Sequence, residues 1–145
     1  MRARLDIPAG KLHRFSHRSE ILGHNRLGDT ATREIIVYTP HGHDGSGLPL
    51  LVDIVGYTSG GPAHANWKNF GENVPERLDR LIHDGSLPPV AVAFPDCFTR
   101  LGGNQYIDSQ VMGPWATWLT TEMLEDVEGR FKCGGKGRRG IFGKS

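Results

Sequence analysis

The chain has 145 residues, the length of one domain, and its 37% hydrophobic and 23% charged residues are ordinary for a soluble globular protein. A formal net charge of +1 gives no electrostatic support for a nucleic-acid or membrane-surface partner, and we expect neither. No run approaches the roughly 18 apolar residues of a membrane span, and residues 1–18 lack the apolar core of a signal peptide. The sequence therefore predicts a cytoplasmic protein.

Residues 1–18 are predicted to form an N-terminal extension, and the domain itself is placed at 19–145. Basic residues are spread through the extension without a clear period, which argues against a nucleic-acid-binding tail. His13 and His17 would share one face of a helix, but two histidines without a third ligand are a weak sign of a metal. The His-Gly-His-Asp sequence at 41–44 is better interpreted as a solvated turn. No metal site is expected.

Three strands are predicted before the first helix. Residues 19–27 and 33–39 are joined by a Gly-Asp-Thr turn, and we interpret them as a hairpin. Residues 48–55 form a nearly continuous apolar run, which is typical of a strand buried on both faces. The glycine-rich segment 56–61 follows, and open α/β sheets place ligand-binding backbone at the carboxyl end of such a central strand.

Two helices alternate with the later strands. Asn73, Pro75 and Glu76 match a capping box with an early proline, so a helix with one apolar face is expected to begin there. Residues 89–94 are the next buried strand, and residues 115–131 form a second helix whose apolar side chains recur every four positions. The order β-β-β-α-β-α-β predicts an α/β fold with a mixed sheet, parallel in its later part, and helices on both faces.

The chain closes with a short apolar strand candidate and Gly-Lys-Ser at 143–145, which allow two interpretations. The first is the front half of a Gly-x-Ser-x-Gly nucleophile elbow, which would make Ser145 a nucleophile. The second is a phosphate-binding loop, Gly-x-x-x-x-Gly-Lys-Ser. The spacing disfavours this loop, because its first glycine would fall at Arg138 and its interior would contain Ile141 and Phe142. A nucleotide-binding protein is therefore only a weak alternative.

Four segments are informative in combination. They are Val55-Gly56-Tyr57, Phe94-Pro95-Asp96, the helix at 115–131 and Gly143-Lys144-Ser145. Together they resemble the α/β-hydrolases of the esterase group that includes esterase D (S-formylglutathione hydrolase), enterochelin esterases, feruloyl and acetylxylan esterases and mycolyltransferases. The resemblance spans residues 19–145 and covers only the N-terminal half of such a domain. It therefore implies an α/β-hydrolase sheet that is incomplete at its C-terminus.

The resemblance implies roles for few residues. Ser145 would be the nucleophile, and the N–H of Tyr57, which follows Gly56, would be one oxyanion-hole donor. The triad of this fold follows the order Ser, then Asp or Glu, then His, but all seven histidines precede Ser145. The acid and the histidine are therefore expected from the missing C-terminal half of the domain, on the same gene product or as a separate chain. No cofactor is implied.

We therefore expect a serine carboxylic-ester hydrolase that acts on a small-molecule ester through an acyl-enzyme on Ser145. An acyltransferase of the same fold and a non-catalytic α/β-hydrolase-like binding module are the alternatives. Trp67, Tyr106 and Trp115 are candidate walls for the acyl group, although burial in the core is an equally good interpretation of each. A homo-oligomer is left open.

Overall fold

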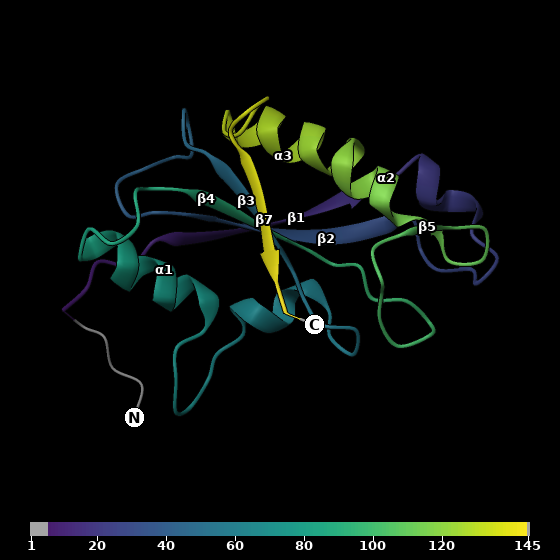
Figure 1. Ribbon diagram of the computed structural model, residues 1–145, viewed down its shortest axis with the longest axis horizontal. Helices are drawn as coiled ribbons and strands as arrows, with labels where there is room; N and C mark the ends of the chain where they lie inside the picture. The colour runs from purple at the N-terminus through teal and green to yellow at the C-terminus, as the bar shows by residue number, and fades with distance from the viewer. Residues whose placement is uncertain (1–5, 145) are drawn as a thin grey trace.

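The computed structural model describes residues 6–144, arranged as in Figure 1. The main sheet contains β1 (Lys11–Arg18), β2 (Thr32–Thr39), β3 (Leu50–Ile54), β4 (Ala91–Pro95) and β7 (Arg139–Gly143). The short strands β5 (Asp108–Ser109) and β6 (Gly113–Pro114) form a separate ribbon. The helices are α1 (Val74–His83), α2 (Trp115–Thr120) and α3 (Glu122–Phe131), and the 3₁₀ turns are η1 (Ile21–His24) and η2 (Gly61–Ala65). Ser145, the predicted nucleophile, lies outside the described residues.

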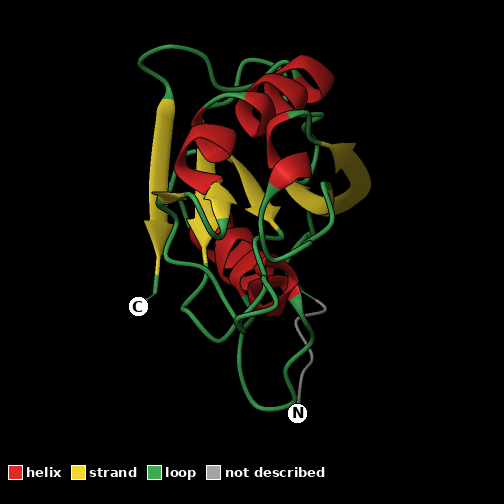
Figure 2. Ribbon diagram, turned by 90° about the vertical axis from the view of Figure 1, so that its right-hand side faces the viewer, coloured by secondary structure: helices red, strands yellow, loops and turns green. Residues whose placement is uncertain are grey.

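The main sheet has the strand order β1-β2-β4-β3-β7. β2 is antiparallel to both β1 and β4, whereas β3 is parallel to both β4 and β7. Helices α2 and α3 lie on one side of the sheet, and α1 and η2 lie on the other (Figure 1). These observations confirm the predicted α/β class, with a mixed sheet that is parallel in its later part and has helices on both faces. Figure 2 shows β7 as the outermost strand on one side.

The core lies on both faces of β3 and β4, as their apolar runs predicted. On the face of α2 and α3, Trp118 and Met123 are fully buried and pack in one cluster with Val52 of β3. On the opposite face, Leu78 of α1 packs in a second cluster with Phe94 of β4. The two clusters bury the central strands from both sides, which is the usual condition of strands in a parallel sheet.

Helix α1 begins as the capping pattern predicted. The Asn73 side chain accepts a hydrogen bond from the Glu76 N–H at 2.9 Å, and the Glu76 carboxylate accepts one from the Asn73 N–H at 3.3 Å. The two bonds satisfy backbone donors that the first turn of a helix leaves without partners. The Asn73 amide also donates to the Ala65 carbonyl at 3.2 Å, which attaches the start of α1 to η2.

The first strand differs from the prediction. Lys11–Arg18 form β1, which pairs along the whole length of β2, from Lys11 opposite Thr39 to Arg18 opposite Thr32. Phe15 of β1 packs against the core, with the Arg130 guanidinium 4.1 Å from its ring centroid. Residues 11–18 therefore belong to the sheet and not to an N-terminal extension. Basic side chains on the exposed face of β1 concealed its alternating pattern.

Residues 19–27, predicted as the first strand of the hairpin, contain η1 instead. Short polar side chains hold this turn. The Leu22 N–H donates to the Ser19 hydroxyl at 3.0 Å, and the Asn25 amide donates to the carbonyls of Leu22 at 2.9 Å and Asp29 at 3.0 Å. Such bonds compete with strand pairing for the backbone. The hairpin exists, but β1 and not residues 19–27 is its first strand.

The predicted helix at 115–131 is two helices. Thr121 separates α2 from α3 and has φ −125° and ψ −90°, which are not helical. The Thr120 hydroxyl donates to the Ala116 carbonyl at 2.8 Å, and the Thr121 hydroxyl donates to the Thr117 carbonyl at 2.6 Å. Back-bonding of this kind bends helices. Within residues 6–144, no helix is long and apolar enough to cross a membrane.

A charged cluster attaches β1 to α3. His17 Nδ1 lies 2.6 Å from Asp126 Oδ2, and His17 Nε2 lies 3.6 Å from Glu122 Oε2. The Ser19 hydroxyl donates to Glu122 at 2.5 Å, and Arg130 Nε donates to Asp126 at 2.5 Å. Burial favours the neutral form of each carboxyl group, but the hydrogen bonds outweigh it and lower the pKa of both Glu122 and Asp126.

We expect this cluster to make the fold acid-sensitive. A carboxyl group with a lowered pKa in the folded chain stabilises the fold above its unfolded pKa of about 4, and this contribution is lost as the pH falls through the folded value. The melting temperature, followed by circular dichroism, should therefore fall below about pH 5. A Glu122→Gln/Asp126→Asn variant should melt at a lower temperature at pH 7. Its melting temperature should also fall less on acidification. An acid profile identical to that of the wild type would contradict this assignment.

Candidate functional site

A cleft of about 570 Å³ lies at the carboxyl ends of β3 and β7. Three segments line it: residues 54–57 at and just beyond the end of β3, residues 104–106 from the loop after β4, and residues 141–144 at the end of β7. The predicted oxyanion segment and the strand that leads to the predicted nucleophile therefore meet at one cleft. This is the end of the sheet at which open α/β folds bind ligands.

β7 approaches β3 closely where it leaves the sheet. A Cβ atom on Gly143 would lie 2.1 Å from the Ile54 carbonyl oxygen, so only glycine fits. The Lys144 N–H donates to the same carbonyl at 3.2 Å. Ile141 and Phe142 lie within β7, whereas a phosphate-binding loop would need them in its interior, and this contradicts the nucleotide-binding alternative. The arrangement agrees with the strand of a nucleophile elbow. The role of Ser145 as the nucleophile stays a prediction.

The predicted oxyanion segment, Gly56 and Tyr57, is held from two sides. The Tyr106 hydroxyl donates to the Val55 carbonyl at 2.6 Å, just before this segment. Gly103 packs directly against Tyr57, because a Cβ atom on Gly103 would lie 1.3 Å from the Tyr57 carbonyl oxygen. These contacts fix the backbone on which an oxyanion donor depends. The assignment of the Tyr57 N–H as that donor stays a prediction.

Tyr106, one of the predicted aromatic walls, does line the cleft. Its φ of +58° is left-handed, which is uncommon for a bulky residue, and its N–H donates to Asn104 Oδ1 at 2.7 Å. The buried Asn104 amide in turn donates to the Cys97 carbonyl at 2.9 Å. Burial, with a smaller effect of nearby acidic groups, raises the pKa of Tyr106 to about 12. Its hydroxyl therefore keeps its proton at neutral pH and can donate the hydrogen bond to the Val55 carbonyl. Its contact with a substrate stays a prediction.

Trp67 and Trp115, the other two predicted aromatic walls, do not line the cleft. Trp115 is 1% exposed, its ring centroid lies 5.7 Å from that of Trp118, and the Arg33 guanidinium lies 4.7 Å from its ring centroid. Its Nε1 donates to the Met112 carbonyl at 2.9 Å. Trp115 is therefore a core residue, and its prediction as a substrate wall is corrected. Trp67 is 61% exposed and follows η2, outside the set of residues that line the cleft.

A buried Asp–His pair, not predicted from the sequence, lies just before the cleft. Asp53 of β3 has no exposed surface, and its Oδ2 lies 2.7 Å from Nδ1 of His64 in η2. Burial raises the pKa of Asp53, and the interaction with His64 offsets part of that rise. Among the described residues, Asp53 Oδ1 is buried without a hydrogen-bond partner. The sequence contained one sign of this pair, Asp53 itself, because a charged residue in an apolar strand needs a buried partner.

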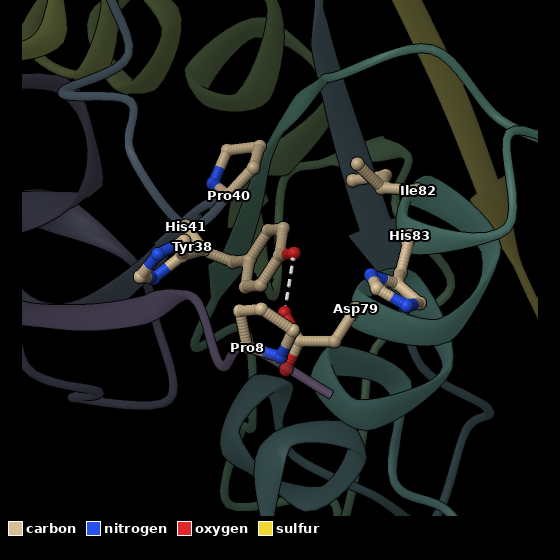
Figure 3. A pocket seen from close by; sticks show the side chains of 7 residues that line it. All are labelled: Pro8, Tyr38, Pro40, His41, Asp79, Ile82 and His83. Atoms are coloured by element: carbon tan, nitrogen blue, oxygen red, sulfur yellow. Dashed lines mark hydrogen bonds between the residues drawn. The ribbon is translucent and has the colours of Figure 1, made fainter. Parts of the chain in front are cut away.

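A smaller hollow of about 140 Å³ lies beside the end of α1 (Figure 3) and shares no lining residue with the cleft. The Tyr38 hydroxyl donates to Asp79 Oδ1 at 2.7 Å, and the Gly10 N–H donates to the same oxygen at 2.9 Å. Burial, assisted by Asp79, raises the pKa of Tyr38. His41 and His83 stand on different sides of this pair (Figure 3). The part of the chain that the structure describes contains no group of three side chains suited to a metal.

The fold is similar to that of solved α/β-hydrolase esterases. No protein-family model and no curated protein sequence matches the chain. Solved structures do match. One is a ferulic acid esterase, with a TM-score of 0.73 and 21% identity over 93% of this chain and 50% of that chain. Another is a ferulic acid esterase from Anaeromyces mucronatus in complex with ferulic acid, with a TM-score of 0.71 and 13% identity over 99% and 52%.

An S-formylglutathione hydrolase from Agrobacterium tumefaciens is also similar, with a TM-score of 0.60 and 20% identity over 94% of this chain and 50% of that chain. These matches confirm the predicted resemblance to α/β-hydrolase esterases at the level of the fold. This chain spans about half the length of the solved structures that it matches.

Proposed function

We propose that this protein is a serine carboxylic-ester hydrolase that acts through an acyl-enzyme on Ser145. One observation carries the proposal: the end of β7, which leads to Ser145, and the clamped backbone of Gly56 and Tyr57 line the same cleft. A nucleophile and an oxyanion donor must both reach one reacting carbonyl group, the nucleophile at its carbon and the donor at its oxygen. The similarity of the fold to esterases supports the same chemistry.

In the proposed reaction the Ser145 hydroxyl attacks the ester carbonyl while a histidine takes its proton. The Tyr57 N–H donates to the oxyanion of the tetrahedral intermediate, a contribution that typically lowers a barrier by about 3–4 kcal/mol. The histidine then gives the proton to the leaving alcohol. Water, deprotonated by the same histidine, releases the acid and regenerates Ser145. We propose that the histidine and its acidic partner come from residues beyond this chain.

We also propose that the remaining half of the domain covers β7. Ile141 of β7 is 66% exposed, and β7 is the edge strand of the main sheet, paired with β3 on one side. A groove of about 370 Å³ adjoins it, and its apolar lining includes Val52, Leu119 and Leu124. An unpaired edge beside an apolar groove favours a further strand and a helix packed against it. A continuation of the same gene product and a separate chain both fit this surface.

The acyl group is proposed to lie against Tyr106 and Tyr57, which both line the cleft. Tyr57 is 43% exposed, and aromatic rings of this kind pack well against a planar acyl group. The complex of the similar Anaeromyces mucronatus enzyme with ferulic acid favours such a group. An acyltransferase would form the same acyl-enzyme, and the access of an alcohol acceptor to it would decide between the two activities.

Hydrolysis of p-nitrophenyl acetate tests this proposal on protein expressed from the complete gene, so that any polypeptide that accompanies residues 1–145 is retained. Ser145→Ala is expected to lower kcat/KM by at least about 10³-fold, because loss of a nucleophile removes the covalent route. The matched control is Ser86→Ala, which changes an exposed serine in the turn after α1 and should leave the rate unchanged. Equal rates for the wild type and Ser145→Ala would overturn the proposal.

A further inference from the structure

The Asp53–His64 pair has no part in the acyl transfer, and stability explains it poorly. Asp53 is fully buried in the central strand β3, and one of its carboxylate oxygens has no partner among the described residues. Removal of a carboxylate from water is expensive, and apolar residues of similar volume often stabilise a fold as well as a buried ion pair does. The geometry of the pair therefore needs another explanation.

His64 is the only polar side chain in η2 and the fourth of its five residues. One end of η2 rests on β4, because a Cβ atom on Gly61 would lie 2.0 Å from the Pro95 carbonyl oxygen. The other end is attached to the start of α1 through the hydrogen bond from Asn73 to the Ala65 carbonyl. The bond to Asp53 adds the attachment to β3. η2 is thus fixed to three different elements.

The position of η2 determines where the predicted oxyanion loop ends. Residues 55–60 connect β3 to η2 and contain the loop 56–60, and the Ala63 N–H donates to the Gly60 carbonyl at 3.0 Å. Asp53 lies in the strand before this loop, and His64 lies in the turn after it. The bond between their side chains therefore spans the loop and fixes the separation of its two ends.

We propose that His64 is a positioning residue whose imidazole, held by Asp53, sets the backbone of residues 56–60. The catalytic consequence rests on the proposed function, whereas the structural consequence does not. A displaced Tyr57 N–H would stabilise the oxyanion less without weakening substrate binding. Turnover should then fall while KM is retained, and a misplacement of about 1 Å can cost about 100-fold in rate.

Two amide substitutions separate positioning from a chemical role of His64. In His64→Asn the amide N–H replaces Nδ1 and can still donate to Asp53, whereas His64→Gln places its amide near Nε2. Hydrogen exchange of residues 56–60, measured by mass spectrometry, should lose protection in His64→Ala and His64→Gln. His64→Asn should keep it. Wild-type protection in His64→Ala would overturn the proposal.

Kinetics on p-nitrophenyl acetate give the second test. His64→Ala is expected to lower kcat by about 10- to 100-fold with KM unchanged, and His64→Asn should restore most of the rate. A His64→Asn variant with a protected loop but the low kcat of His64→Ala would overturn the proposal in favour of a catalytic Nε2. If the wild type hydrolyses no ester, the proposed function fails, and the exchange data still decide the positioning role.

A double variant covers the case in which the single variants fold poorly. Asp53→Leu/His64→Leu removes both polar groups and leaves no unpaired charge in the interior, so the stability of the wild type should be retained. Loop protection should still be lost, because apolar side chains set no fixed separation. Full protection of residues 56–60 in the double variant would contradict the proposal.

Discussion

A Gly103→Ala variant is expected to lose about 1–3 kcal/mol of unfolding free energy, or more, because this position has no room for a methyl group. The added Cβ atom would lie 1.3 Å from the Tyr57 carbonyl oxygen, which is far inside van der Waals contact. The Gly103 carbonyl accepts a hydrogen bond from the buried Thr99 hydroxyl at 2.6 Å, so the loop around Gly103 cannot move freely. The Tyr57 backbone would therefore have to shift, and the cleft with it.

Gly129→Ala is the matched control for this substitution. It adds the same methyl group within α3, where nothing lies within 4 Å of the new atom. Alanine is preferred to glycine inside a helix by about 0.5–1 kcal/mol, so this variant should be more stable than the wild type. Urea denaturation followed by circular dichroism measures both changes. A Gly103→Ala variant as stable as the wild type would contradict the close packing of the two loops.

Trp118→Ala is expected to cost about 3–5 kcal/mol, the usual loss when a large aromatic side chain is removed from a core. Trp118 has no exposed surface, and its ring lies 5.7 Å from Trp115 and 5.8 Å from His17, measured between centroids. The change would open a cavity at the centre of the α2–α3 face. Chemical denaturation at pH 7 measures the loss.

Trp118→Phe is the control, because it keeps an aromatic ring at the same place. Among the described residues, the Trp118 Nε1–H is buried without an acceptor, so its removal breaks no hydrogen bond. The loss should therefore be much smaller than for alanine. Equal losses for the two variants, or a loss below about 1 kcal/mol for Trp118→Ala, would contradict the placement of this side chain in the core.

The parts of the fold that the sequence predicted depend on local rules. The runs at 48–55 and 89–94 are almost continuously apolar, which is typical of strands buried on both faces. The start of α1 was predictable because Asn73 and Glu76 satisfy each other's backbone donors within one turn. Neither feature requires knowledge of the rest of the chain.

The missed elements depend on contacts between distant residues. β1 is a strand because it pairs with β2 and packs Phe15 against the core, whereas its own sequence is dominated by basic residues. The break at Thr121 follows from hydroxyl groups that bond back to the preceding turn, an option that periodicity does not reveal. Propensity is a weak guide where tertiary pairing decides the structure.

The candidate site was predictable where it is built from strand ends. Gly56 and Tyr57 follow β3 and Gly143 ends β7, and parallel strands bring their carboxyl ends to one edge of the sheet. The aromatic residues were harder, because a single sequence does not encode that Trp115 is buried in the core whereas Tyr106 lines the cleft. The Asp53–His64 pair depends on how η2 folds back over β3, and no local pattern indicates that.

The activation of Ser145 is the central claim, and intact-mass spectrometry with a fluorophosphonate probe tests it most directly. The probe is applied to the protein expressed from its complete gene, and peptide mapping then locates the adduct. Such probes react with a serine whose hydroxyl is deprotonated by a neighbouring base. The proposed function predicts one adduct per chain, on Ser145, and none in Ser145→Ala. A folded protein that forms no adduct, or forms it on another residue, would contradict the account.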